Sequence, residues 1–218
     1  MYHAINRGDG RTPLFRTDRE YLAFLALLEE GRQHVPMRIL GYCLMSDHWH
    51  LVLWPRSDGD LSNFIRWVCT TQVRRWRMRR RSAGAARTAR LYQGRFKCFP
   101  IQPDEHLLKA LRYVETSPLR ASRVKRAELW SFSSLSAGDR APANRVQLDA
   151  GPVARPTNWK RWVNQPIAAD ELVRLDISLQ RGRPYGTDRW THAAATRLGL
   201  ESTLRPIGRP KKSAKKKV

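Results

Sequence analysis

The sequence predicts an α+β fold in which an antiparallel β-sheet is covered by helices. Strand-like and helix-like segments follow one another along residues 1–137 in the order β-α-β-β-α-β-α. Two apolar runs flank the short turn Ser46-Asp47, a pattern typical of an antiparallel hairpin. Together these observations indicate a ferredoxin-like or RRM-like sandwich. A basic, Pro-, Gly- and Arg-rich C-terminal extension follows over residues 138–218.

The first half of this fold is predicted to hold three strands and one helix. Residues 1–7 form a short strand, and GDGRTP after it is rich in turn residues. Thr17 or Asp18 can cap a helix that continues to about Gln33. The runs VPMRILGYCLM and HWHLVLW then form the two strands of the hairpin.

The second half contains two further helices and one further strand. A helix is predicted from Leu61 to about Arg81, followed by the loop SAGAARTA. RFKCFPI is predicted to be the fourth strand. The last helix runs from Asp104 to Ser117 and ends there because Pro118 follows.

The C-terminal extension has few apolar runs and a linker-like composition. Two short helices are predicted in it, around 168–180 and 188–199. The tripeptide GRP occurs twice, at 182–184 and 208–210, and the final KKSAKKKV is predicted to be a disordered basic tail.

The charge of the chain indicates a polyanionic partner. Lys and Arg number 41 against 19 Asp and Glu, a formal net charge of +22. Nucleic acid is the usual partner of such a protein, because binding releases counterions from its phosphates. A GC-rich genome also raises the arginine content, and ribosomal and membrane-surface proteins share this balance. The charge therefore indicates the class of partner and not the reaction.

The sequence shows no pattern of a membrane span or a signal peptide. Its three cysteines, Cys43, Cys69 and Cys98, are widely spaced and suit reduced thiols in the cytoplasm. We therefore expect a cytoplasmic protein without a membrane partner.

Two histidines in the second hairpin strand could hold a metal ion. His48 and His50 are two positions apart, so both imidazoles leave the same face of the sheet. Two neutral imidazoles can bind one divalent ion and leave coordination positions open for a phosphate oxygen. The same pattern also fits two histidines that are simply hydrogen-bonded in a core.

Tyr113 is the candidate nucleophile. At helical spacing it lies off the apolar stripe of its helix, near the last turn. A phenol is a weak nucleophile, but a metal ion that polarises a phosphate makes its attack feasible. The alternative is a tyrosine that packs at a helix edge. His106 is about 20° from Tyr113 around the helix, so it could orient the phenol or be an ordinary surface histidine.

The helix over 61–81 interleaves Trp67 and Trp76 with arginines, which suits stacking on unpaired bases. It also fits a half-buried helix with a solvated basic face. The RGRP peptide that starts at Arg181 matches the core of minor-groove-binding AT-hook segments. The predicted DNA-binding residues are Arg7, Arg66, Trp67, Arg74, Arg75, Arg95, Lys97, Arg181 and Arg183.

Three ordered blocks resemble one family. LMSDHWHLVLWP is similar to the L-M-x-N-H-x-H-L-L motif of the HUH single-tyrosine transposases. LYQGRFKCFPIQPDEHLLKALRYVETSPLRAS resembles the block that carries their catalytic tyrosine, and HAINRGDGRTPLFR resembles their N-terminal motif. The subgroup that the chain looks most like is the REP-associated tyrosine transposases, with 1–137 as the catalytic domain.

The resemblance implies an enzyme, a DNA transposase and endonuclease, with His48 and His50 as ligands of Mg²⁺ or Mn²⁺. Tyr113 would attack single-stranded DNA beside palindromic REP-like hairpins, leaving a 5′-phosphotyrosine and a free 3′-hydroxyl. The protein would act in the bacterial cytoplasm, at the nucleoid. Relatives work as monomers or as homodimers, and the sequence leaves both open.

Two positions depart from the family pattern. Asp47 stands where an asparagine often precedes the first histidine, and Ser117 replaces an asparagine of the metal site. A serine hydroxyl is a shorter and poorer ligand, so we expect Ser117 to complete a weaker site, with water filling the gap. The main alternative is a non-catalytic hairpin-binding protein with an eroded metal site. A basic RNA-associated protein is the third, and the RNP aromatics expected for it are missing from the central strands.

Overall fold

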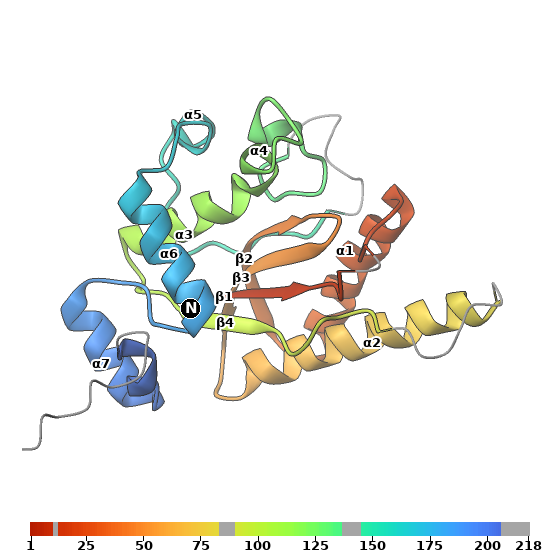
Figure 1. The fold of residues 1–218 in the computed structure, drawn as a ribbon, viewed down its shortest axis with the longest axis horizontal. Helices are drawn as coiled ribbons and strands as arrows, with labels where there is room; N and C mark the ends of the chain where they lie inside the picture. The colour runs from red at the N-terminus through yellow and green to blue at the C-terminus, as the bar shows by residue number, and fades with distance from the viewer. Residues whose placement is uncertain (11–12, 83–89, 137–144, 206–218) are drawn as a thin grey trace, which may run out of the picture.

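Residues 1–10, 13–82, 90–136 and 145–205 are described by the structure, a computed structural model (Figure 1). Most of the predicted SAGAARTA loop, the second GRP and the tail KKSAKKKV lie outside these ranges. No helix within the described ranges is long and apolar enough to cross a membrane.

The centre of the fold is a four-stranded antiparallel sheet. The strands are β1 (Tyr2–Arg7), β2 (Met37–Leu44), β3 (His48–Pro55) and β4 (Lys97–Pro100). They lie in the order β2-β3-β1-β4, with β2 and β3 joined by the predicted hairpin. This order confirms the predicted ferredoxin-like arrangement, in which strands distant in sequence pair at the centre of the sheet.

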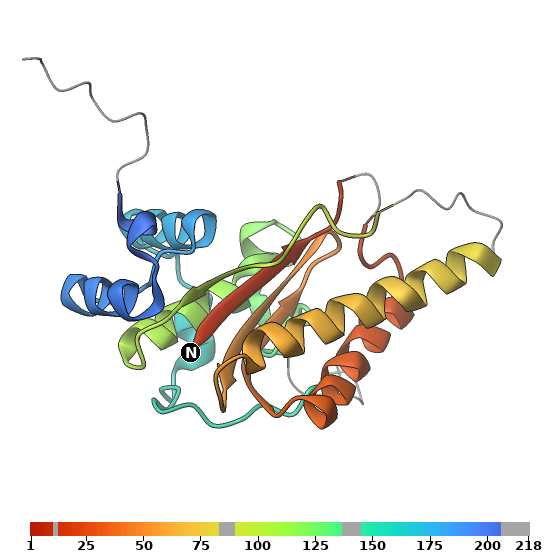
Figure 2. The same ribbon diagram turned by 90° about the horizontal axis from the view of Figure 1, so that it is seen from below.

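Two long helices, α1 (Asp18–His34) and α2 (Asp60–Ser82), cover one face of the sheet (Figure 2). Their apolar sides share a core with strand residues such as Trp49 and Leu51. Gly31 lets the two helices approach closely, because a Cβ atom there would lie 2.9 Å from Phe64. Trp76, predicted to stack on bases, is only 7% exposed in this core. The stacking interpretation of Trp76 is therefore wrong, because its ring is buried in the core.

Helix α3 (Glu105–Glu115) lies on the opposite face, against β2 and β3. Gly41 makes this possible, because a Cβ atom there would lie 2.6 Å from the Leu111 side chain. Leu107, Leu111 and Val114 bury their side chains against this second face, as the predicted apolar stripe requires.

The chain keeps turning after α3. The sequence predicts an end at Pro118, but a short helix, α4 (Ser117–Arg120), follows directly and has the proline in its first turn. Proline is tolerated at that position because its missing N–H needs no partner there. Helix α3 thus ends close to the predicted position, but the prediction that no helical structure continues beyond it was wrong.

The described part of the extension, 145–205, begins beside α1 and β2, where Asp149 binds Arg32 and Ile39, and its helices then pack on the same face as α3. It contains α5 (Trp159–Val163), α6 (Ala169–Arg181) and α7 (Asp188–Leu198), the last two near the predicted positions. Buried side chains from it join the core beside α3, among them Trp159, Val163, Leu175 and Tyr185. This part of the chain is therefore built onto the sheet and is not a linker.

The RGRP peptide is not an extended segment. Arg181 is the last residue of α6, and Gly182 ends the helix in the left-handed conformation, with φ of 71°. Pro184 is buried, and its carbonyl accepts a hydrogen bond from the Thr191 hydroxyl. The AT-hook interpretation of residues 181–184 is therefore wrong for this structure, because a helix cap uses the same residues.

Candidate active site

The β-sheet brings three histidines to one face. In the register between β1 and β3, Arg7 lies opposite His48 and Ile5 lies opposite His50. Residues that lie opposite each other project to the same side of a sheet, and so do residues two positions apart. His3 therefore shares the face of His48 and His50, and this is the face that α3 covers.

Each predicted metal ligand has one ring nitrogen occupied. The Nδ1 atom of His50 lies 2.9 Å from Nε2 of His3, and Nδ1 of His48 donates to Oδ1 of Asp47 at 2.7 Å. In both histidines the other ring nitrogen, Nε2, takes no part in these two contacts. Histidines that bind metals commonly have their second nitrogen hydrogen-bonded in this way, because the bond fixes the ring and its tautomer.

The three imidazoles are held in the neutral form that can bind a metal. Burial lowers the pKa of His3 from 6.5 to about 3 and lowers the pKa of His50 well below its usual value. Burial also lowers the pKa of His48, although the Asp47 carboxylate opposes this shift. A neutral imidazole keeps a lone pair for coordination, so the two predicted ligands have the correct protonation state.

Tyr113 lies in the last turn of α3, over the histidines. Its ring centre is 6.1 Å from the ring centres of both His3 and His50. The side chain is buried, and the Arg120 guanidinium stacks on the ring at 3.7 Å. The hydroxyl donates a hydrogen bond to Oδ1 of Asp176 in α6, at 3.0 Å.

The phenol of Tyr113 is protonated at neutral pH. Burial raises its pKa, the positive charge of Arg120 lowers it in part, and the carboxylate of Asp176 raises it further. The predicted nucleophile therefore has to lose a proton when it reacts.

The predicted third ligand, Ser117, has its hydroxyl turned toward its own helix. It donates to the carbonyl of Tyr113 at 3.3 Å and accepts from Arg120 at 3.1 Å. No three His, Cys, Asp or Glu side chains of the described residues are grouped closely enough to hold a metal ion. Coordination by Ser117 stays a prediction, and it would require the hydroxyl to leave these partners.

A basic cleft opens beside the histidines. It has a volume of about 390 Å³ and is lined by Arg7, Arg95 and Lys97 together with Leu179 and Gln180 of α6. These three cations were predicted to bind DNA, and the structure brings them together at the end of the sheet that carries His48. Cations of this kind are the usual contacts of phosphate groups.

The other predicted DNA-binding residues are not at this cleft. Trp67 of α2 stacks on His34, with the ring centres 4.5 Å apart, and Arg75 forms an ion pair with Glu30 at 2.6 Å. Arg181 donates to the carbonyl of Ser202. Four of the predicted residues lie on α2, on the far side of the sheet: Arg66, Trp67, Arg74 and Arg75. Binding of DNA by these residues stays a prediction.

A comparison with protein families identifies the chain. The family model described as an IS200-like transposase matches residues 1–117, a segment that includes β1 to β4, both histidines and Tyr113. The chain belongs to the IS200-like transposase family.

Two further comparisons give similar proteins. A Haemophilus influenzae protein assigned as a REP-associated tyrosine transposase is 25% identical over 130 residues, which are 57% of this chain and 73% of the relative. A solved structure of a REP-associated tyrosine transposase bound to a REP hairpin is 16% identical, with a TM-score of 0.49, over 68% of this chain and 92% of that one. The family model and the Haemophilus relative confirm the resemblance inferred from the motifs.

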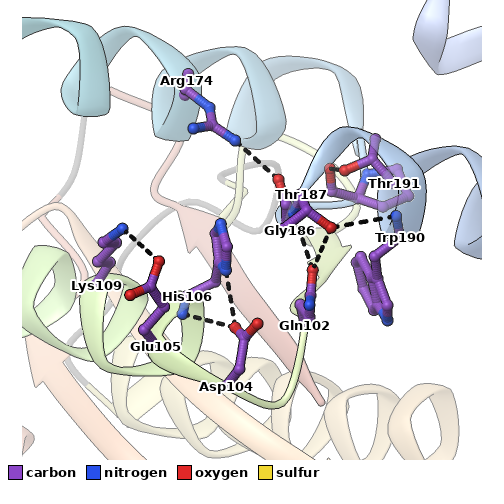
Figure 3. A network of polar contacts seen from close by, with 11 residues as sticks. Gln102, Asp104, Glu105, His106, Lys109, Arg174, Gly186, Thr187, Trp190 and Thr191 are labelled. Atoms are coloured by element: carbon purple, nitrogen blue, oxygen red, sulfur yellow. Dashed lines mark hydrogen bonds and ion pairs between the residues drawn. The ribbon is translucent and has the colours of Figure 1, made fainter.

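His106 does not contact the predicted nucleophile in this IS200-like transposase. Its Nδ1 donates to Asp104 at 2.8 Å (Figure 3). Its ring packs edge-on against Tyr185. The hypothesis that His106 orients the phenol is therefore wrong. His106 and Tyr113 have similar angles around α3, but His106 lies two turns earlier. There Tyr185 of the extension packs beside it.

Three residues at the site of this transposase were not predicted from the sequence: His3, Arg120 and Asp176. His3 follows from the alternation in β1 once the register is known. Arg120 lies just after α3 in the matched block. No sequence signal distinguishes Asp176 from other acidic residues of the extension.

Proposed function

We propose that this protein cleaves and rejoins single-stranded DNA that carries REP-like palindromic hairpins. Tyr113 is the nucleophile, and His48 and His50 hold Mg²⁺ or Mn²⁺. The observation that carries the proposal is the position of Tyr113 over the histidine face of the sheet, with ring centres 6.1 Å apart for Tyr113 and His50. Membership of a transposase family and the name of the Haemophilus relative support it.

The residues of the site divide the work of a phosphoryl transfer. When bound, the metal ion polarises the scissile phosphate and stabilises its developing charge. The Tyr113 oxygen attacks phosphorus, and the DNA 3′-oxygen leaves. The protein then carries a 5′-phosphotyrosine, which keeps the energy of the broken bond for rejoining. Arg7, Arg95 and Lys97 position the backbone of the strand.

Two neutral histidines fit part of a divalent-ion site, and Ser117, water or a DNA phosphate oxygen would fill the remaining positions. This incomplete set is also the observation that favours a second candidate function. With the hydroxyl of Ser117 bound to Tyr113 and Arg120, the protein would bind hairpins without cutting them.

Covalent capture tests the proposal. A single-stranded hairpin substrate, labelled at its 3′ end, is incubated with the protein and Mn²⁺, and the adduct is separated on a denaturing gel. The wild-type protein should carry the label, whereas Tyr113→Phe should bind the hairpin with unchanged affinity and form no adduct. Tyr21→Phe is the matched control, because Tyr21 lies in α1 on the other face of the sheet.

An adduct in Tyr113→Phe would exclude Tyr113 as the nucleophile. Hairpin binding by the wild-type protein with no adduct at any Mn²⁺ concentration would select the second candidate. Loss of the adduct in His50→Gln, with binding retained, would support the metal site.

A further inference from the structure

The extension places one carboxylate on the oxygen of the predicted nucleophile. Asp176 is in the second half of α6, 63 residues after Tyr113, and its Oδ1 accepts the hydrogen bond from the phenol at 3.0 Å. The contact joins the first 117 residues, which the family model matches, to a segment that it does not match.

Helix α6 is fixed in this position at both ends. Before it, the Arg112 guanidinium donates to the carbonyls of Gln165 and Pro166, both at 2.9 Å. After it, the chain pairs beside Ile101, with the Tyr185 amide donating to the Pro100 carbonyl at 2.8 Å. The hydrogen bond on Tyr113 is therefore made by an anchored helix.

The network of Figure 3 strengthens the second anchor. Arg174 in α6 donates to the carbonyl of Gly186 at 2.8 Å, and the amide of Thr187 donates to the Gln102 side chain at 2.8 Å. Gly186 is required there, because a Cβ atom would lie 2.5 Å from that side chain. These contacts tie α6 to the turn between β4 and α3, the helix that carries Tyr113.

The groups around the phenol come from four elements. Arg120 of α4 stacks on the ring, His3 of β1 and His50 of β3 lie beneath it, and Asp176 of α6 contacts the oxygen. The two histidines contact the ring of Tyr113, and a guanidinium cannot accept a proton. Among the described residues around Tyr113, the Asp176 carboxylate is the group that accepts the hydrogen bond of the phenol and is placed to take its proton.

We propose that Asp176 is a catalytic residue that accepts the phenol proton as Tyr113 attacks the DNA phosphate. The inference rests on the function proposed above. In cleavage, the O–H bond of the phenol breaks, its proton goes to the carboxylate, and the Tyr113 oxygen bonds to phosphorus. The bond from phosphorus to the 3′-oxygen breaks, and that oxygen takes a proton from water.

The same carboxyl group serves the reverse step. In rejoining, a 3′-hydroxyl attacks the phosphotyrosine and gives its own proton to solvent, and the protonated Asp176 returns its proton to the leaving phenol oxygen. A single residue thus acts as base in one direction and as acid in the other. The extension is consequently part of the active site.

The test compares Asp176→Asn with Asp170→Asn, a substitution in the first turn of the same helix. Asparagine keeps the size and can accept the hydrogen bond, but it cannot take a proton. We expect unchanged hairpin affinity without metal, and a single-turnover rate of adduct formation at saturating hairpin and Mn²⁺ that falls by roughly 10²–10⁴-fold. Asp170→Asn should react at the wild-type rate.

Chemical rescue separates proton transfer from a structural role. Asp176 is exposed, so Asp176→Ala opens a space that formate can enter. Sodium formate should accelerate adduct formation by this variant in proportion to its concentration, and sodium chloride at equal ionic strength should not. A structural role of the side chain would give no such rescue.

The possible results are distinct. Suppose that the wild type forms the adduct and Asp176→Asn forms it at the same rate or faster; this inference alone is then overturned. A faster rate would mean that the hydrogen bond to Asp176 inhibits the attack by Tyr113. Absence of any adduct in the wild type overturns this inference together with the proposed function.

Discussion

The Nε2 atom of His3 lies 2.9 Å from the Nδ1 atom of His50, in the centre of the sheet. For Nε2 of His50 to bind a metal, its Nδ1 must carry the proton and donate it to His3. His3 then carries its own proton on Nδ1, an atom for which the described residues provide no hydrogen-bond partner. His3 therefore fixes the tautomer and the ring orientation of the predicted ligand.

Replacing His3 should weaken metal binding. Phenylalanine keeps the ring packing against Phe99 but cannot accept the proton of His50. We expect His3→Phe to bind Mn²⁺ about 10–100-fold more weakly, the usual effect of removing the partner of a metal-binding histidine. Calorimetric titration of the protein without DNA measures it. His106→Phe is the control, because it removes a buried histidine with a carboxylate partner away from the site. Equal affinity of His3→Phe and wild type would contradict the orienting role.

The sequence predicted the parts of this site that are defined locally. His48 and His50 are two positions apart in one strand, so their common face needs no knowledge of the tertiary structure. The hairpin and the long helices follow in the same way from turn residues and apolar spacing. Tyr113 was found through the family resemblance, because a tyrosine off the apolar stripe has no distinctive pattern.

What could not be predicted depends on contacts between distant segments. His3 joins the site only because the register places β1 beside β3. Asp176 does so only because α6 packs against α3, and nothing in the composition of the extension indicates this packing. The arginines interleaved with tryptophans in α2 left base stacking and a half-buried helix both open, and the structure buries Trp76 in the core that α1, α2 and the sheet share.

The buried histidines should make the protein sensitive to acid. Unfolded histidines have a pKa of about 6.5, whereas burial lowers that of His3 to about 3. Between these values the unfolded chain binds a proton that the folded protein does not, so the free energy of unfolding falls as pH falls. The loss for one such histidine is up to about 1.4 kcal/mol per pH unit.

Denaturant titrations between pH 7.5 and 5, with a chelator present, measure this dependence. His3→Phe should show a smaller slope below pH 6.5 than the wild type. His192→Asn, which changes an exposed histidine of α7, should keep the wild-type slope. If all three proteins had the same slope, His3 would not be buried in its neutral form.

Glu115 should be important for stability and not for chemistry. It is fully buried and accepts hydrogen bonds from Ser134, Arg155 and Trp159. Glu115→Ala leaves these donors without their acceptor, so we expect a loss of about 3–5 kcal/mol in the free energy of unfolding.

The control for Glu115 is Glu105→Ala, which removes an exposed ion pair with Lys109 and should cost less than about 1 kcal/mol. Chemical denaturation of both variants makes the comparison. Similar small losses would show that the buried network around Glu115 contributes little to folding.

The basic cleft should set the affinity for DNA. Arg95→Ala with Lys97→Ala removes two cations from the cleft and should flatten the dependence of log Kd on log salt by about 1.4–1.8. The control pair is Arg56→Ala with Arg189→Ala, two exposed residues at the opposite end of β3 and on α7. Fluorescence titrations with a hairpin at several salt concentrations measure the slopes. An equal change in both pairs would mean that net charge, and not the cleft, determines binding.

The point of truncation should decide whether the shortened protein stays active. Deleting residues 206–218 removes five lysines and one arginine, so hairpin affinity and its salt dependence should fall, because fewer phosphates are neutralised. Adduct formation at saturating hairpin should continue at the wild-type rate, because Asp176 and its anchors remain.

Deleting 181–218 instead removes Tyr185 and α7, which hold the end of α6 beside β4. That variant should lose stability and form the adduct slowly even at saturating hairpin. Single-turnover rates and thermal melts of both truncations make the comparison, and a full rate in the longer deletion would mean that α6 keeps its position without the second anchor.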